Sequence, residues 1–460
     1  YQDPQGELSV VIGYDGRINS DVFAKDSAEI FAGAGIKVSL FDSPVPTPVA
    51  CFTGARLGSS ATIVVTASHN PPRDNGYKVY LGGPLFGSQL VPPQDKEIAS
   101  LISETATNLS FSEIPKAANY AVLSEPAVQL YRDRALQLVS PENAARSELR
   151  ISYTAMHGVG YRVIDPIFRS LGFALNSVPE QQEPNGQFPT VSFPNPEEPG
   201  AMDLSFSHAK DFNSDLILAN DPDADRLAVA VKTASGYQML TGDEVGLLLA
   251  EVIAANGAGG SIANSIVSAS LEPLAKHYGV HYEQTLTGFK WISKVKDLSY
   301  GYEEALGYCV DPSHTPDKDG ITAAVLIAEL AANLKAKGQS LLDLLSELSD
   351  RYGHLKTSQV SIRVTDLSLI GKIMAGVRAT PLKELLGEAV EFEDLALGLR
   401  LKPTEGVILK TESIQVIIRP SGTEPKLKCY LQVRGASADA ALAKLEELKG
   451  FASDYLKSLS

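Results

Sequence analysis

Residues 35–65 read GIKVSLFDSPVPTPVACFTGARLGSSATIVV and place a strand, a helix and a second strand in close succession. The runs Gly35–Leu40 and Ala61–Val65 are apolar and rich in β-branched residues, which favour strands. Between them a proline-rich turn precedes Pro48–Leu57, which is expected to be helical. A strand, a helix and a strand in this order are typical of α/β folds with a parallel or mixed sheet.

The same alternation continues on both sides of this stretch and then restarts twice. Further strands are predicted at Val10–Ile12, Leu149–Tyr153, Leu216–Ala219 and Ser265–Val267. Helices are predicted at Asp21–Ala34, from about Tyr161 onward, and from the last of these strands to Tyr278. The repeated pattern indicates several α/β units in one chain.

The pattern changes towards the end of the chain. From Val360–Val364 onward it reads strand, helix, strand, strand and helix, and Ala436–Leu456 forms the closing helix. This order is typical of an α+β domain. At roughly 100–200 residues a domain, a chain of 460 residues has about three or four domains. We place four domains at residues 1–142, 143–255, 256–352 and 353–460.

Composition places the chain among folded proteins and argues against two kinds of partner. Apolar residues make up 44% of the chain, charged residues 21%, and the net charge is −15. An acidic surface disfavours nucleic acid and anionic membranes, which bind basic faces. The apolar runs are too short to span a bilayer. The cysteines lack metal-ligand or disulfide-scaffold spacing, which indicates a reducing, cytoplasmic location. Monomer and dimer are both left open.

A serine stands beside a histidine where the strand Ala61–Val65 ends, in the segment Thr66–Pro72, TASHNPP. Prolines and an asparagine suit a turn, but a turn does not require Ser68 next to His69. A plain turn after a buried strand is the alternative interpretation. Two loops further along the chain, with cation- and anion-binding residues, favour a chemical role for this serine.

Three carboxylates follow the strand Leu216–Ala219 in the segment DPDADR, namely Asp221, Asp223 and Asp225. They repel one another unless a cation lies between them, and all-oxygen ligands suit Mg²⁺ or Mn²⁺. A calcium EF-hand is excluded, because it needs glycine and glutamate where Arg226 and Lys232 stand. Three protein ligands leave a coordination position of the metal ion open, and a phosphate oxygen on Ser68 would fill it. An acidic surface turn is the alternative.

A third loop, Arg419–Lys426, reads RPSGTEPK and lies between the predicted strands Ile414–Ile418 and Leu427–Val433. A guanidinium, two hydroxyls and a glycine-relaxed backbone form an anion cradle, with a plain hairpin turn as the alternative. Weaker signals are Lys290 beside the only tryptophan and the acidic segment around Glu303. Adjacent acids of this kind either hydrogen-bond the hydroxyls of a sugar or form a solvated acidic turn.

Taken together, these segments resemble the α-D-phosphohexomutase family, which includes phosphoglucomutases, phosphomannomutases, phosphoglucosamine mutases and phosphopentomutases. The resemblance runs from Gly13–Arg17, GYDGR, to Arg419–Lys426, with the loops in the family's order and spacing. It implies four domains around a central cleft. Three are related α/β domains with mixed sheets, and the fourth is a smaller C-terminal α+β domain.

The resemblance also implies roles by position. The residues that match the family's phosphoserine and its catalytic neighbours are Ser68, His69, Lys78, Arg226 and Lys318, with Lys318 as the proton-transfer candidate. The residues that match Mg²⁺ ligands are Ser68, Asp221, Asp223 and Asp225. The residues that match substrate-binding positions are Lys290, Glu303, Ala305, Arg419, Ser421, Gly422 and Thr423.

The implied reaction is an intramolecular phosphoryl transfer. Phospho-Ser68 would donate its phosphoryl group to a sugar monophosphate, the bisphosphorylated sugar would turn end for end, and Ser68 would take the other phosphate back. One Mg²⁺ in each active site and a sugar 1,6-bisphosphate as activator are implied with it. We expect transfer between the 1- and 6-positions of a hexose phosphate, glucose first, with mannose phosphate or a pentose phosphate as alternatives.

Two departures from the family's pattern affect these expectations. Ala305 stands where a serine often stands, and YEEALGY is most similar to the branch of phosphopentomutases and some bacterial phosphoglucomutases. No Gly-Leu-Arg-Gly-like arginine precedes GYDGR, so we expect a further N-terminal segment. Two rival functions are a metal-dependent phosphatase and a non-catalytic phosphosugar-binding protein. The second is disfavoured by Ser68, the three aspartates and Lys318.

Overall fold

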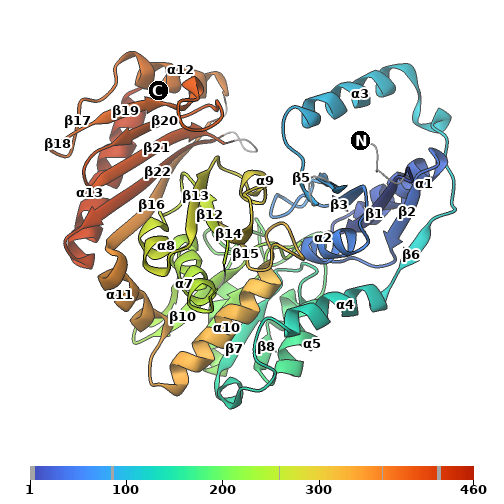
Figure 1. The fold of residues 1–460 in the computed structure, drawn as a ribbon, viewed down its shortest axis with the longest axis horizontal. Helices are drawn as coiled ribbons and strands as arrows, with labels where there is room; N and C mark the ends of the chain where they lie inside the picture. Colours follow the sequence, from blue (N-terminus) through green and yellow to red (C-terminus); the bar gives the residue numbers. More distant parts are fainter. Residues whose placement is uncertain (1–5, 84–86, 258, 365, 422–425, 460) are drawn as a thin grey trace. The chain divides into compact units, whose positions relative to one another are not determined.

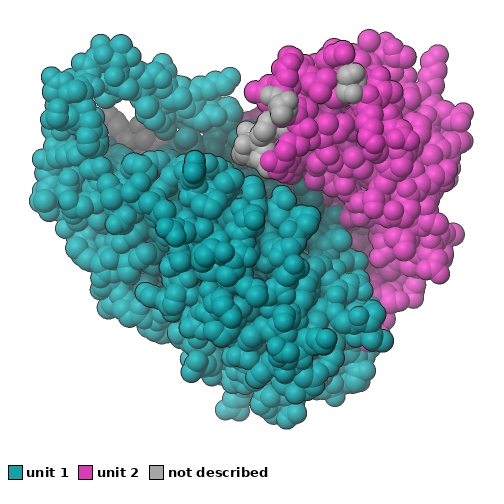
Figure 2. All heavy atoms as spheres, turned by 180° about the vertical axis from the view of Figure 1, so that it is seen from behind, with its two compact units in different colours: residues 1–263, 278–283, 288–342 teal, residues 264–277, 284–287, 343–460 magenta. Residues whose placement is uncertain are grey.

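The computed structural model describes residues 6–83, 87–257, 259–364, 366–421 and 426–459 (Figure 1). The chain divides into two compact units, coloured separately in Figure 2. Unit 1 consists of Tyr1–Ala263, Tyr278–Glu283 and Gly288–Leu342, and unit 2 of Asn264–His277, Gln284–Thr287 and Asp343–Ser460. The described strands form four sheets and one short two-stranded ribbon.

The first sheet has six strands in the order β5-β4-β3-β1-β2-β6. They are β1 (Ser9–Tyr14), β2 (Lys37–Phe41), β3 (Ala61–Val65), β4 (Tyr77–Leu81), β5 (Ser88–Gln89) and β6 (Ala121–Leu123). The accompanying helices are α1 (Ser20–Gly33), α2 (Thr47–Arg56), α3 (Gln94–Asn108) and α4 (Glu125–Leu136). β1 pairs in parallel with both β2 and β3, whereas β4 runs antiparallel to β3. The loops after β1 and β3 therefore leave the sheet at the same edge.

The second sheet has the order β11-β10-β9-β7-β8. Its strands are β7 (Arg150–Thr154), β8 (Ala174–Ser177), β9 (Leu216–Ala219), β10 (Ala228–Thr233) and β11 (Gly236–Met239). Helices α5 (Tyr161–Leu171), α6 (Asp203–Phe212) and α7 (Gly242–Ala255) accompany it. β9 is parallel to β7 and antiparallel to β10, so the segment between β9 and β10 is a tight connection, and it carries the three aspartates.

The third sheet has the order β13-β12-β14-β15. Its strands are β12 (Ser261–Ser265), β13 (His281–Thr285), β14 (Leu298–Glu303) and β15 (Gly307–Cys309). The helices are α8 (Glu272–Tyr278), α9 (Phe289–Ile292), α10 (Gly320–Ala336) and α11 (Leu341–Tyr352). The prediction of a strand at Ser265–Val267 is wrong. The observed strand shares only Ser265 with the predicted range, and Ile262 is its one large apolar residue, whereas Ile266 and Val267 follow it in a turn.

The fourth sheet is antiparallel, with the order β16-β22-β21-β20-β19. Its strands are β16 (His354–Arg363), β19 (Glu391–Asp394), β20 (Val407–Lys410), β21 (Ile414–Pro420) and β22 (Lys426–Gly435). β17 (Glu384–Leu385) and β18 (Glu388–Ala389) form the ribbon, and α12 (Ser368–Ala379) and α13 (Ala438–Ser458) are the helices. β16 starts six residues before the predicted Val360. Its polar first half gives no apolar signal, but it pairs with β22 throughout.

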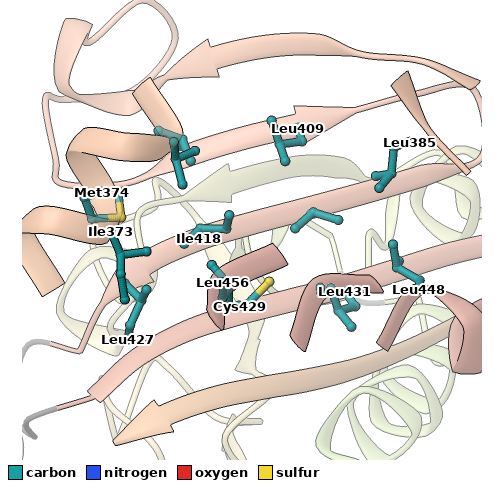
Figure 3. Packing of buried hydrophobic residues seen from close by; sticks show 14 of the residues in the cluster. Ile373, Met374, Leu385, Leu409, Ile418, Leu427, Cys429, Leu431, Leu448 and Leu456 are labelled. Carbon is teal, nitrogen blue, oxygen red and sulfur yellow. The ribbon is translucent and has the colours of Figure 1, made fainter. Parts of the chain in front are cut away.

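One face of this sheet and its two helices enclose the apolar core of unit 2. Ile418, Leu427, Cys429 and Leu431 from the strands pack with residues of α12 and α13, among them Leu448 and Leu456 (Figure 3). Each buried side chain of this size stabilises the fold by about 1.5–3 kcal/mol relative to exposure. The apolar side chains on one face of these strands are covered by α12 and α13.

The expected fold class is confirmed: three sheets of mixed α/β type precede a smaller antiparallel α+β unit. Short 3₁₀ segments occur at Phe111–Glu113, Ala144–Glu148, Pro179–Gln181 and Leu395–Leu397. The domain boundaries at residues 142, 255 and 352 stay a prediction. Among the described residues, no helix combines the length and the apolar character that a membrane crossing requires.

Candidate active site

Ser68 lies in the loop between β3 and β4, and the guanidinium of Arg17 holds this loop from inside. Arg17 Nη2 donates hydrogen bonds to the carbonyl oxygens of Ser68 and Asn70, at 2.5 and 2.6 Å. Arg17 Nη1 donates to the carbonyl oxygens of Pro71 and Asp74, at 2.8 and 3.2 Å. Ser68 itself has a left-handed backbone with φ 52°. A non-glycine residue keeps this conformation only where its surroundings enforce it, as the arginine does here.

Two further side chains fix the start of the loop. Asp15 Oδ2 accepts a hydrogen bond from Thr66 Oγ1 at 2.7 Å, and Thr66 Oγ1 accepts one from the Ser68 backbone N–H at 2.8 Å. The Phe188 ring lies over the Arg17 guanidinium, 5.0 Å from Cζ to the ring centroid. Arg17 is thus a buried residue with backbone, carboxylate and aromatic partners.

Arg17 and Asp15 belong to the segment GYDGR, for which no role was predicted from the sequence. The signal was present, because both follow β1, and β1 lies next to β3 in parallel. In sheets of this kind, functional loops gather at the carboxyl ends of neighbouring strands. The pairing order of the strands was not predicted, so this neighbourhood was missed.

The Ser68 hydroxyl faces the acidic segment that follows β9. Its Oγ donates to Asp221 Oδ2 at 3.1 Å and lies 3.3 Å from His69 Nδ1. Burial, reinforced by the positive charge of Arg226, holds the pKa of His69 well below its usual value. The structure therefore brings Ser68, His69 and Asp221 together. Their catalytic roles stay a prediction.

The three aspartates are completely buried and converge. One oxygen from each of Asp221, Asp223 and Asp225 lies within 4.8 Å of the others. The second oxygens of Asp223 and Asp225, their Oδ1 atoms, accept no hydrogen bond from any described residue. An acidic surface turn, the alternative interpretation of this segment, is wrong, because none of the three carboxylates reaches solvent.

Three cationic side chains balance these acids. Lys78 Nζ lies 2.6 Å from Asp223 Oδ2 and 2.5 Å from Asp225 Oδ2. Lys318 Nζ lies 3.3 Å from Asp225 Oδ2, and Arg226 Nε lies 3.9 Å from Asp225 Oδ1. We call the set of Asp221, Asp223, Asp225, Lys78, Arg226 and Lys318 the charged cluster.

The charged cluster shifts the pKa values of its members in opposite directions. Burial raises the pKa of Asp221 well above its usual value, and the neighbouring Asp223 and Asp225 add to the rise. Burial alone would also raise the pKa of Asp225, but the charges of Lys318 and Lys78 outweigh it and lower this pKa. In the two lysines the nearby aspartates overcome burial and raise the pKa of each ammonium.

The donor set fits a hard divalent cation. Carboxylate oxygens are the ligands that Mg²⁺ prefers, and two of the oxygens present have no hydrogen-bond partner among the described residues. Burial is the main cause of the raised pKa of Asp221, and a cation at this point would relieve the repulsion from Asp223 and Asp225 that adds to it. Asp221, Asp223 and Asp225, with an oxygen on Ser68, are the residues that would hold it.

Arg226 connects the acidic segment to the predicted sugar loop. Its backbone N–H donates to Asp221 Oδ1, and its Nη1 donates to the carbonyl oxygen of Ala305 at 3.0 Å. Glu303, at the end of β14, is buried, and its charge contributes to the raised pKa of Arg226. Ala305 therefore takes part through its backbone, which a change of its side chain leaves in place.

Lys290 lies on the short helix α9, next to Phe289. The Phe289 ring centroid is 5.7 Å from Lys318 Nζ, so α9 borders the charged cluster through this neighbour. Lys290 itself is half-buried, and its role in substrate binding stays a prediction.

The predicted phosphate loop belongs to unit 2. Arg419 is half-buried near the end of β21 and pairs in register with Lys428 of β22, and the Ser421 backbone N–H donates to the Lys426 carbonyl oxygen at 2.8 Å. Gly422 and Thr423 lie outside the described residues. The role of this loop stays a prediction.

Comparison with known proteins places the chain in a family. Models of the phosphoglucomutase/phosphomannomutase alpha/beta/alpha domains I, II and III match residues 1–109, 129–236 and 241–352, and the model of the C-terminal domain matches residues 360–448. The chain belongs to the phosphoglucomutase/phosphomannomutase family. It is an enzyme of the isomerase type, an intramolecular phosphotransferase.

Individual members of the phosphoglucomutase/phosphomannomutase family are similar over nearly the whole chain. A protein of Haemophilus influenzae named "Probable phosphomannomutase" is 46% identical, over 96% of this chain and 92% of its own length. A Schizosaccharomyces pombe protein named "Probable phosphoribomutase" is 35% identical, over 96% and 82%. The open form of a Paramecium phosphoglucomutase has the same fold, with a TM-score of 0.75, 18% identity, and coverage of 98% and 88%.

Proposed function

We propose that this chain is a phosphosugar mutase in which Ser68 carries the phosphoryl group. The observation that carries the proposal is the Ser68 hydroxyl 3.1 Å from Asp221, at the edge of a buried cluster of three acids and three cations. Among the described residues, no carboxylate is hydrogen-bonded to His69, so Ser68 and His69 lack the oriented triad that a hydrolytic serine uses. Ser68 is well built to hold a charged group next to a cation site.

Two transfers of the same kind make up the reaction. In the first, the bond between phosphorus and Ser68 Oγ breaks and a bond forms from phosphorus to a free hydroxyl oxygen of the sugar monophosphate. The hydroxyl proton passes to a base, and an acid gives a proton to the departing Ser68 oxygen. The bisphosphorylated sugar then turns end for end. In the second, Ser68 Oγ gives its proton to a base and bonds to the other phosphorus, the bond between this phosphorus and the sugar oxygen breaks, and the sugar oxygen takes up a proton.

The residues around Ser68 can orient and neutralise the group that moves. Arg17 holds the backbone of Ser68, so the oxygen is fixed before the transfer. Lys78 and Lys318 place positive charge beside the acids, where it can attract the negatively charged phosphoryl group. Lys318 is our candidate for holding and releasing the proton of the sugar hydroxyl.

Mg²⁺ on the three aspartates would neutralise charge on the phosphoryl group during its transfer. A sugar 1,6-bisphosphate would serve as activator, because it restores the phosphate on Ser68 whenever the intermediate escapes. In unit 2, Arg419, Ser421, Gly422 and Thr423 would bind the phosphate that is not being transferred.

For the sugar, we propose hexose phosphates with glucose first. Two alternatives have specific support. The Haemophilus relative is named for mannose phosphate, and the Schizosaccharomyces relative for ribose phosphate. The carbonyl oxygen of Ala305 accepts a hydrogen bond from Arg226. The Ala305 side chain has no hydroxyl, whereas the family often has a serine at this position.

A coupled assay with glucose, mannose, glucosamine and ribose 1-phosphates tests the proposal. Each is offered with Mg²⁺ and a trace of the matching bisphosphate, and both the isomer and free phosphate are measured. We expect isomer formation that depends on the bisphosphate, fastest with glucose 1-phosphate. Release of free phosphate without isomer would instead establish the phosphatase alternative.

A further inference from the structure

Lys318 stands between two buried aspartates, and each of them binds a tyrosine from the region of the first sheet. Tyr80 OH donates to Asp317 Oδ2 at 2.6 Å. Tyr131 OH lies 2.7 and 2.8 Å from the two carboxylate oxygens of Asp319. All four side chains are buried. Both bonds connect residues remote in the sequence, so packing, not local structure, creates them.

The first bond follows from the pleat of β4. Lys78 and Tyr80 are two residues apart on this strand, so their side chains leave the same face. Lys78 reaches Asp223 and Asp225, and Tyr80 reaches Asp317. One strand face therefore supplies an ammonium to the acidic segment after β9 and a hydroxyl to the segment that carries Lys318.

The carboxylate of Asp317 lies between Tyr80 and the lysine, and its contact with the lysine is electrostatic. While Oδ2 accepts the tyrosine hydrogen bond, Oδ1 lies 4.0 Å from Lys318 Nζ. On the far side of the lysine, Asp319 caps helix α10 by accepting the backbone N–H groups of Ile321 and Thr322, both at 3.0 Å. Tyr131 thus holds the residue that anchors Lys318 to the helix.

The space around the Lys318 stem is narrow. A Cβ atom on Gly307 would lie 2.2 Å from Lys318 Cδ and 2.9 Å from Lys318 Cγ. The ammonium ends 3.3 Å from Asp225. A shift of residues 317–319 would therefore move the ammonium away from the charged cluster, because the stem has no room to compensate.

We propose that Tyr80 and Tyr131 are positioning residues, whose hydroxyls hold Asp317 and Asp319 so that the Lys318 ammonium stays at Asp225. The inference rests on the proposed function in one respect, the role of Lys318 in the transfer. Neither tyrosine touches the substrate in this scheme. They act through the two carboxylates that flank the lysine.

The variants Tyr80→Phe and Tyr131→Phe remove one hydroxyl each and keep the ring in place. Tyr300→Phe is the matched control, because Tyr300 is equally buried and its hydroxyl donates to the Gly246 carbonyl oxygen at 2.9 Å. Because a displacement of about 1 Å can cost about a hundredfold in rate, we expect each test variant to lose about tenfold in kcat. KM should stay within about twofold, and the control should keep both values.

A double-mutant cycle separates positioning from general structural damage. In a Lys318→Met background, each Tyr→Phe change should lower kcat by less than about twofold, because the group that it positions is already gone. A loss of the same size in both backgrounds would overturn the proposal. The two tyrosines give two independent cycles, so that one poorly folding variant leaves the other decisive.

A measurement that needs no activity completes the test. Competitive labelling of lysines with acetic anhydride, quantified by mass spectrometry of peptides, reports how accessible the Lys318 ammonium is relative to that of Lys335. We expect Lys318 labelling to rise severalfold in either test variant and to stay constant in Tyr300→Phe. Unchanged labelling would refute the positioning role even if the proposed reaction is correct. Unchanged turnover in Ser68→Ala would refute the reaction without changing this readout.

Discussion

The charged cluster of unit 1 and the apolar core of unit 2 bury their side chains equally well, for opposite physical reasons. In the core, Leu427, Leu431 and Leu448 are buried, and their removal from water stabilises the folded state (Figure 3). In the cluster, Asp221, Asp223 and Asp225 are equally inaccessible, but taking charges out of water costs several kcal/mol each. Burial of apolar residues therefore marks stability, whereas burial of several charges together marks a site.

The largest expected effect separates activity from stability. Ser68→Ala should lower mutase turnover at least about a thousandfold, because the group that carries the phosphoryl is removed. Ser68 is half-buried and its side chain contributes little apolar packing, so the urea midpoint should stay unchanged. Steady-state kinetics and urea unfolding measure the two quantities. Turnover at the wild-type rate would refute the assignment of Ser68.

The apolar core should behave in the opposite way. Leu448→Ala removes a fully buried side chain of α13 and should lower the free energy of unfolding by about 2–5 kcal/mol. Activity for each folded molecule should be unaffected. On the same helix, Leu442 is 49% exposed, so Leu442→Ala should change stability by less than about 0.5 kcal/mol. Equal losses in the two variants would contradict the packing of α13.

A third test concerns a buried acid outside the cation site. Burial raises the pKa of Asp319 from 3.8 to about 6, although hydrogen bonds from Thr322 and Tyr131 oppose the rise. The folded state therefore keeps this proton more firmly than the unfolded state. The protonated Asp319 carboxyl therefore adds to the free energy of unfolding below about pH 4, and this addition is lost as the pH rises through about 6. This contribution amounts to about 3 kcal/mol.

The variant Asp319→Asn should lack this pH dependence, because asparagine also caps a helix but does not titrate. The quantity to compare is the free energy of unfolding of the wild type minus that of the variant, between pH 4 and 7. A constant difference across this range would show that Asp319 is ionised in the folded state at pH 4.

The smallest effect tests whether the charged cluster is a cation site. Asp223→Asn removes one carboxylate and should weaken the activation of turnover by Mg²⁺ by about 10–100-fold. Asp211→Asn, a change of an exposed aspartate on α6, is the control and should leave the Mg²⁺ titration as it is. An identical titration for the two variants would show that the acids hold only Lys78 and Lys318.

Much of the fold was predictable because strands and helices are specified by local patterns. The strands Ala61–Val65 and Leu216–Ala219 are found where β-branched and apolar runs predicted them. β12 was misplaced because four of its five buried residues are small or polar and only Ile262 is large and apolar, so the strand leaves no apolar run in the sequence. β16 was predicted too short because its first half is specified by pairing with β22.

The candidate site was predictable only in part, and the reason is the range of its contacts. Ser68 and the three aspartates were found because each group stands in one short loop at the end of a strand. Arg17 is 51 positions from Ser68, Lys78 is 145 positions from Asp223, and Tyr80 is 237 positions from Asp317. No local pattern relates such residues, because sheet order and packing bring them together.

The sequence by itself therefore determined which groups are present and in which loops they lie: a serine after one strand, three acids after another, and a loop rich in anion-binding groups near the end. The tertiary structure decided that the acids are buried and which cations form ion pairs with them. It also decided that Arg17 grips the Ser68 loop and that two tyrosines hold the neighbours of Lys318. Burial and opposing charge depend on distances between elements, and only the packed chain sets those distances.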